Sequence, residues 1–176
     1  MSGVNMDSIV IGFSKPKKWF EPFSWLIRLG TWSPFSHAYV KYYNSYVCRW
    51  EVFQASGLKV NFIGQAMFDS EEDIYAEFEI PISAATKLSV IQFAIDNVGS
   101  SYAVGQIFGF PLVWFMSFFG KKIRNPFYNG SNYFCSELVT DVLKEIKSVG
   151  DQMDPGTATP KDVYLYLLSK GYKVIA

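Results

Sequence analysis

The sequence predicts a single α+β domain in which a small antiparallel sheet packs against amphipathic helices. Short runs rich in β-branched and aromatic residues recur in the first half of the chain, and segments with helical periodicity flank them. The 176 residues suit one domain with a sizeable core, and we assign residues 1–176 to it. Strands grouped between helices, without a strict strand–helix alternation, are typical of the α+β class.

The strand predictions rest on β-branched and aromatic residues bounded by turn residues. The predicted strands are 8–13, 36–43, 46–56, 58–63 and 73–81. Asn44 and Ser45 predict a tight turn that joins the second strand to the third as a hairpin. Gly57 and Pro81 end the strands that precede them.

Four helices are predicted from apolar periodicity and from residues that start or stop helices. They span 21–30, 83–98, 135–146 and a final segment from about Pro160. In the first, Pro22 is tolerated in the opening turn and Gly30 ends the helix. In the second, the apolar residues recur at helical spacing and Gly99 follows the last turn.

The stretch 103–119 contains no charged residue and is long enough to be considered as a membrane span. Gly105, Gly109 and Pro111 also suit two short buried helices with a bend between them. We favour the buried pair of helices. Two other interpretations remain: an apolar lid, and a surface that contacts a membrane or an acyl chain.

Charge and cysteine content exclude several functional classes. Sixteen basic residues balance sixteen acidic ones, so the chain lacks the positive charge expected of a nucleic-acid binder. Cys48 and Cys135 form neither a disulfide framework nor a metal-binding pattern, and we expect no metal or cofactor. The first residues place their charges after a short apolar run, which is not a secretory signal and predicts a protein that is cytoplasmic or delivered without one.

Cys135 begins a strongly amphipathic helix. The apolar stripe comprises Cys135, Leu138, Val139, Val142, Leu143 and Ile146, and the polar face comprises Ser136, Glu137, Thr140, Asp141, Lys144 and Glu145. Ser131 or Asn132 is available as the N-cap, which places the inward-facing Cys135 in the first turn. Unpaired N–H groups there can stabilise a thiolate or an oxyanion. A structural buried cysteine explains the same pattern, so both interpretations stay open.

The single histidine is the natural partner for a nucleophilic cysteine. His37 lies near the start of the strand 36–43, where strand alternation places it on one face with Tyr39 and Lys41. A ring at a strand start can reach the end of a neighbouring helix. A lone histidine also serves purely structural roles, so the pattern alone does not decide its function.

An imidazole base needs a third polar group to orient it. Glu51 and Gln54 on the following strand are candidates, and their odd separation puts them on opposite faces, so only one can face His37. We choose Gln54, near the end of the strand. Nothing in the sequence around Cys48 would activate that thiol.

Five segments together resemble the permuted papain-like hydrolases, the YiiX-type branch of the NlpC superfamily. In chain order they are "TWSPFSHAYV", "VFQASGLKV", "NVGSSYAVGQIFGF", "YFCSELVTDVL" and "TPKDVYLYL". The histidine precedes the cysteine by 98 residues, which is the permuted order. The more distant lecithin:retinol acyltransferase-like branch shares this order, but its cysteine motif differs from the one here.

The resemblance implies Cys135 as nucleophile, His37 as base and Gln54 as the third residue. Relatives commonly have a Glu-Ala pair where this chain has Gln54-Ala55. An amide can orient the imidazole but lacks the charge that stabilises imidazolium. The implied fold is a circularly permuted papain-like, barrel-like sheet with the nucleophile helix packed against it.

Our first functional hypothesis is a cysteine peptidase or amidase that cleaves a peptide, such as a cell-wall peptide, or an acyl-amide through a thioester. The aromatic residues expected to wall the substrate site are Trp32, Phe35, Tyr102 and Tyr133. A second hypothesis is a thioester acyltransferase or lipid-amide hydrolase that uses 103–119 for an acyl chain or a membrane. A third is a non-catalytic binding or structural module that retains the fold.

Overall fold

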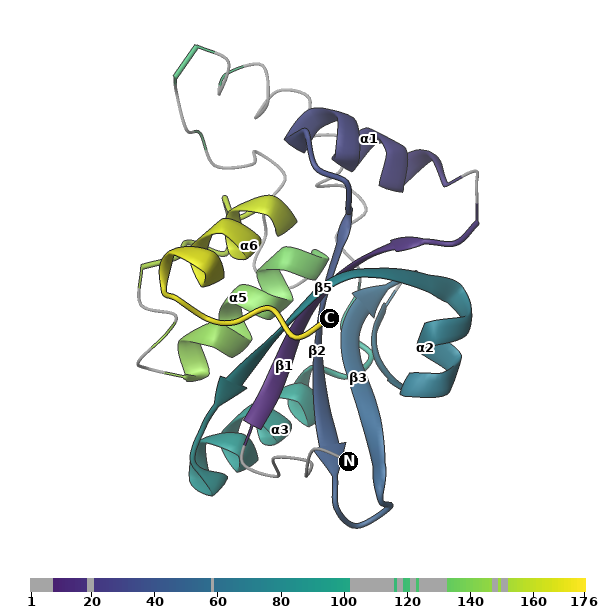
Figure 1. Cartoon of the computed structure of the whole chain (residues 1–176), viewed down its shortest axis with the longest axis vertical. Helices are drawn as coiled ribbons and strands as arrows, with labels where there is room; N and C mark the ends of the chain where they lie inside the picture. Colours follow the sequence, from purple (N-terminus) through teal and green to yellow (C-terminus); the bar gives the residue numbers. More distant parts are fainter. Residues whose placement is uncertain are drawn as a thin grey trace.

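The computed structural model describes residues 8–18, 21–57, 59–101, 116, 119–120, 123, 133–146, 149 and 152–176. Within these residues the chain is α+β, with five strands in one antiparallel sheet and five helices (Figure 1). The predicted fold class is therefore confirmed at this level.

The sheet follows the strands that the sequence predicts. They are β1 (Ser8–Pro16), β2 (His37–Asn44), β3 (Arg49–Ser56), β4 (Lys59–Gly64) and β5 (Glu72–Pro81). Their order across the sheet is β4-β3-β2-β1-β5, so the apolar β1 lies between two partners. Ile11 pairs with Val40 of β2 on one side and with Phe78 of β5 on the other.

The predicted two-residue turn after β2 is wrong. Asn44 still belongs to the strand and pairs with Arg49, and the turn covers residues 45–48. Cys48 closes it with a φ of 48°, a left-handed conformation that a short turn between twisted strands requires. The third strand consequently starts at Arg49 and not at Tyr46.

The helices are α1 (Pro22–Thr31), α2 (Gln65–Glu71), α3 (Ala84–Asn97), α5 (Cys135–Glu145) and α6 (Pro160–Ser169). All but α2 were predicted. Helix α2 is too short to show periodicity, and Phe68 is its one buried side chain. It bridges β4 and β5 and packs beside β3 (Figure 1).

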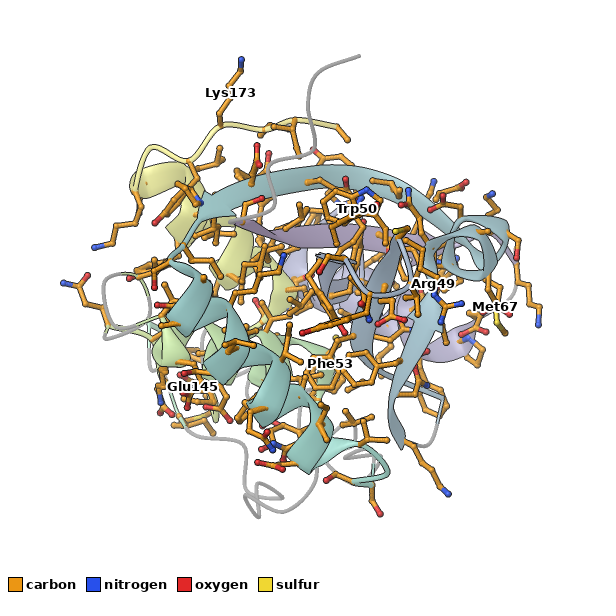
Figure 2. The ribbon with its side chains drawn as sticks, turned by 90° about the horizontal axis from the view of Figure 1, so that it is seen from below. Arg49, Trp50, Phe53, Met67, Glu145 and Lys173 are labelled. Atoms are coloured by element: carbon orange, nitrogen blue, oxygen red, sulfur yellow. The ribbon has the colours of Figure 1, made fainter. Side chains whose placement is uncertain are left out.

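The two faces of the sheet are covered differently. Helices α3, α5 and α6 contribute to the main core on one face, and Figure 2 shows Phe53 of β3 in the interior between the strands and α3. The other face carries α2, where Phe68 packs with Tyr39 and Val52. We call these the α5 face and the α2 face.

A buried charged group lies on the α2 face. The Nζ of Lys41 is 2.7 Å from Oε2 of Glu77, and the hydroxyl of Tyr39 donates to Oε1 of the same carboxylate at 2.7 Å. All three side chains are buried. Each polar atom thus has a partner, as burial of charge demands.

The first turns of helix α5 are buried all round, which corrects the predicted polar face for three of its six residues, while Lys144 and Glu145 are exposed as predicted. Ser136, Glu137 and Thr140 are as buried as the apolar stripe. The Ser136 hydroxyl donates to the carbonyl of Ala158 at 2.6 Å, and the Thr140 hydroxyl donates to the carbonyl of Ser136 at 2.7 Å. The segment before α6 therefore covers the face that the sequence pattern assigns to solvent.

No helix in the described part of the chain is long and apolar enough to cross a membrane. Of the stretch 103–119, only Met116 and Phe119 are described, so our predictions for it lie outside the described residues.

Candidate active site

His37 and Gln54 meet on the α2 face of the sheet. His37 is the first residue of β2, and Val40 pairs with Phe53, a register that places Gln54 on the same side as His37. The Nε2 of His37 lies 2.7 Å from Oε1 of the buried Gln54. The His37 ring stacks at 6.3 Å from Tyr39. The predicted contact between His37 and Gln54 is thus present.

Glu51, the other candidate for the third residue, lies on the opposite side of the strands from His37. It pairs with Tyr42 on the α5 side of the strands, and its carboxylate accepts from the Tyr42 hydroxyl at 2.8 Å. It also accepts from Asn44 at 3.1 Å and from Arg49 at 3.0 Å. These hydrogen bonds lower the pKa of Glu51 against the opposing effect of burial.

Burial keeps the His37 ring neutral. It lowers the pKa of His37 to about 4, and the hydrogen bond to Gln54 offsets only part of that effect. Because Oε1 of Gln54 can only accept, the proton of the neutral ring sits on Nε2. Nδ1 is then left with a free lone pair, which is the form that a general base requires.

Cys135 is the first residue of α5 and contacts the backbone on both sides of His37. Its sulfur is 3.8 Å from the carbonyl oxygen of Ser36. Burial raises the pKa of Cys135 to about 12, and nearby backbone N–H groups, first that of Ala38 and then that of Ser136, lower it in part. The thiol is 1% exposed and therefore protonated at neutral pH.

The thiol contacts the backbone beside His37, while the imidazole lies with Gln54 on the α2 face. Among the contacts of the described residues, the sulfur of Cys135 bonds to the Ser36 carbonyl and not to the ring of His37. The structure brings Cys135, His37 and Gln54 to the start of β2, but the direct proton-sharing contact that we expected is not formed.

The N-cap of α5 differs from the prediction. It is Phe134, and not Ser131 or Asn132, which lie outside the described residues. The backbone N–H of Phe134 donates to the carboxylate of Glu137 at 2.8 Å. Glu137 thus closes the start of the helix from within its first turn, which explains why this acidic residue is buried.

A cavity of about 350 Å³ opens beside the histidine, and we call it the His37 cavity. Its walls come from the segment after β1, from α1, and from the strand ends and the end of α2: Pro16, Lys18, Glu21, Phe23, Ser24, Ile27, Ser36, His37, Ala55, Ser56, Gly57, Glu71 and Glu72. Cys135 is not among them. A ligand in this cavity therefore touches the imidazole before it touches the sulfur.

Glu72 gives the His37 cavity a second titratable group near neutral pH. Burial, together with Glu21, Glu71 and Asp73, raises its pKa to about 7. The Ser14 hydroxyl donates to it at 2.8 Å and opposes this shift. Sequence patterns did not single out these acids, because their position depends on the unpredicted helix α2.

Of the predicted aromatic walls, the three that the structure describes do not line the His37 cavity. Phe35 is buried and packs 5.1 Å from the ring of Phe13, so it belongs to the core. Tyr133 is half-buried and meets Phe93 edge-on at 6.5 Å. Trp32 lines a separate groove, and Tyr102 lies outside the described residues.

Comparisons with known proteins find similar solved structures. No protein-family model matches the chain, and no curated protein matches it. Among solved structures, it is similar to one described as metalloprotein YiiX from Escherichia coli O157:H7, with a TM-score of 0.52 and 14% identity over 97% of this chain and 96% of that one. The two chains share a fold. Among the described residues of this chain, no three or more His, Cys, Asp or Glu side chains gather as metal ligands would.

Proposed function

We propose that this protein is a cysteine hydrolase of the permuted papain-like, NlpC-type class that cleaves an amide bond in a peptide or acyl-amide. The observation that carries the proposal is the 2.7 Å hydrogen bond between His37 and Gln54, with Cys135 at the start of α5 beside the His37 backbone. The bond leaves Nδ1 of the ring unprotonated, as a base next to a thiol must be. The likeness in fold to YiiX supports the class.

In the proposed reaction, Nδ1 of His37 takes the thiol proton of Cys135 as the sulfur adds to the substrate carbonyl carbon. Backbone N–H groups at the start of α5 stabilise the oxyanion. The imidazolium returns its proton to the amide nitrogen, the C–N bond breaks, and the acyl group remains on sulfur as a thioester. Water, deprotonated by His37, then releases the acid and restores the thiol.

The resting site described above has to change for this reaction to start. Both reacting groups are neutral, and the thiol is covered. Substrate that enters the His37 cavity has to move the sulfur of Cys135 from the carbonyl oxygen of Ser36 to the ring of His37. A low reactivity of Cys135 without substrate is therefore part of the proposal.

The test is hydrolysis of a panel of muropeptides, simple peptide amides and lipid amides by the full chain. Wild type is expected to turn over at least one class, and Cys135→Ala and His37→Ala are expected to abolish turnover. Cys48→Ala is the matched control, because that thiol is exposed and has no part in the proposed reaction. Mass spectrometry is expected to find the acyl group on Cys135. Turnover that survives Cys135→Ala refutes the proposal.

The panel also separates the alternative activities. Cleavage of lipid amides but not of muropeptides identifies a lipid-amide hydrolase, and transfer of the acyl group to an added amine in preference to water identifies an acyltransferase.

A non-catalytic binding module is the second candidate, and the burial of the thiol favours it. The sulfur of Cys135 has no hydrogen bond to the ring, and its raised pKa disfavours the thiolate. If the protein is such a module, wild type and Cys135→Ala are expected to bind a ligand in the His37 cavity with equal affinity. Neither is expected to hydrolyse any substrate of the panel.

A further inference from the structure

Helix α1 exposes a concentration of large apolar side chains. Trp25 is 54% exposed, Leu29 60% and Trp32, its C-cap, 87%. Phe23 and Leu26 on the same helix are exposed as well. Single exposed apolar residues are ordinary, but a group of them on one short helix marks a surface that contacts something.

Hydrogen bonds hold α1 with this surface outward. The buried hydroxyl of Ser24 lies 2.6 Å from that of Ser36. At the other end, Nζ of Lys161 in α6 donates to the carbonyl of Thr31 at 3.0 Å and to that of Trp32 at 3.3 Å. Turning the apolar side chains inward would break these bonds, so their exposure is built into the fold. In Figure 1, α1 lies at one end of the molecule, beyond the sheet.

A groove on this surface combines aromatic rings with an arginine. It has a volume of about 330 Å³ and is lined by Trp25, Arg28, Leu29, Trp32 and Ser33. The Nε–H of Arg28 is buried and has no hydrogen-bond partner among the described residues. Because the Arg28 side chain also lines the groove, its guanidinium is placed to donate to a phosphate oxygen, the acceptor whose geometry it fits best.

The charge of α1 indicates an anionic partner. Arg28 is the only charged residue between Pro22 and Thr31. A second copy of the chain is a weaker fit, because a two-fold contact would place the same apolar surface on both sides and would offer Arg28 only the N-cap Glu21 as an acid on this helix. An anionic lipid surface satisfies both the apolar side chains and the arginine.

We propose that α1 docks on an anionic lipid bilayer, with Trp25, Leu29 and Trp32 in the interfacial layer and Arg28 on a lipid phosphate. Tryptophan rings favour this depth because they combine a large apolar body with one N–H donor. The proposal does not depend on catalysis. It has one consequence for the site, since Phe23, Ser24 and Ile27 of α1 also line the His37 cavity, which docking would place next to the lipid.

The test is co-sedimentation of the full chain with phosphatidylcholine vesicles that either contain or lack phosphatidylserine. We expect wild type to bind the vesicles with phosphatidylserine more tightly. The double variant Leu29→Ser/Trp32→Ser is expected to bind at least about tenfold more weakly, since it removes two inserted side chains. Leu88→Ser, which removes an exposed leucine from α3, is the matched control and is expected to bind as wild type does.

Arg28→Gln separates the two parts of the surface. It is expected to weaken binding to phosphatidylserine vesicles about fivefold and to change binding to neutral vesicles little. Circular dichroism of each variant checks the fold. The proposal is overturned if wild type binds neither vesicle, if the double variant binds as well as wild type, or if wild type forms a dimer that the double variant abolishes.

Discussion

Replacing Gln54 by glutamate tests how the His37 ring is controlled. In wild type an uncharged amide oxygen faces Nε2 at 2.7 Å. The substitution Gln54→Glu keeps the size of the side chain and its acceptor oxygen, and it adds a negative charge in contact with the ring. It therefore changes the electrostatics of His37 while leaving the hydrogen bond in place.

The magnitude follows from the pKa of His37. The pKa falls from an ordinary 6.5 to about 4, mainly through burial, and one pKa unit corresponds to about 1.4 kcal/mol. The protein thus disfavours the imidazolium by about 3 kcal/mol. A carboxylate in contact raises the pKa of a cationic group by about 1 to 3 units. We expect the pKa of His37 in Gln54→Glu to lie between about 5 and about 7.

Proton NMR titration of the ring measures this directly. His37 is the only histidine in the sequence, so a preparation without a histidine tag gives one imidazole signal that needs no assignment. Glu51→Gln is the matched control, since Glu51 lies on the other side of the strands and is expected to leave the His37 midpoint unchanged. An ordinary midpoint in wild type, or the same midpoint in wild type and Gln54→Glu, refutes the argument.

Three further predictions concern stability and are measured by urea unfolding. The pKa of Glu72 rises from 4.5 to about 7 on folding, so the folded chain holds this proton more tightly and the contribution of Glu72 to stability falls as pH rises from 4.5 to about 7. Glu72→Gln should therefore become progressively more stable than wild type across that pH range. A stability difference that stays constant with pH contradicts this. Gly12→Ala places a Cβ 2.1 Å from the nearest tyrosine ring carbon and should cost about 1–3 kcal/mol or more, whereas Gly64→Ala meets open space and should change stability by less than about 0.5 kcal/mol. Lys41→Met leaves the buried Glu77 without its cation and should lower the free energy of unfolding by about 3–5 kcal/mol. The double variant Lys41→Met/Glu77→Leu should restore most of this stability. An equal loss of stability in both variants would exclude an electrostatic cause.

Most of the sheet was predictable because its signals are local. The apolar run of β1 and the alternation in β2 and β3 are each visible within a single strand and its turn residues. They can be recognised without knowing which strands pair. Helix α2 escaped prediction because seven residues are too few for periodicity to show. Ser136 was assigned to solvent for a related reason, since its hydroxyl is satisfied by the carbonyl of Ala158 in the segment before α6, and Thr140 donates to the carbonyl of Ser136 within α5.

The site was predicted in part. Gln54 and not Glu51 contacts His37, because strand alternation permits only one of them to face the ring and Gln54 lies near the strand end; its role as the third residue stays a prediction. The aromatic walls failed because aromatic residues near a site in sequence serve the core as readily as a cavity, as Phe35 does. The acids around Glu72 enter the His37 cavity only through the connection that α2 makes between β4 and β5.

By itself the sequence determined which residues are candidates for reactive chemistry, since composition leaves one imidazole and periodicity places one cysteine at a helix start. Tertiary packing alone decided their chemical state. Burial keeps the ring of His37 and the thiol of Cys135 neutral, and the path of the chain places the thiol against the backbone of Ser36 and the ring against Gln54. Desolvation depends on everything that surrounds a group in space, and a linear pattern contains no measure of it.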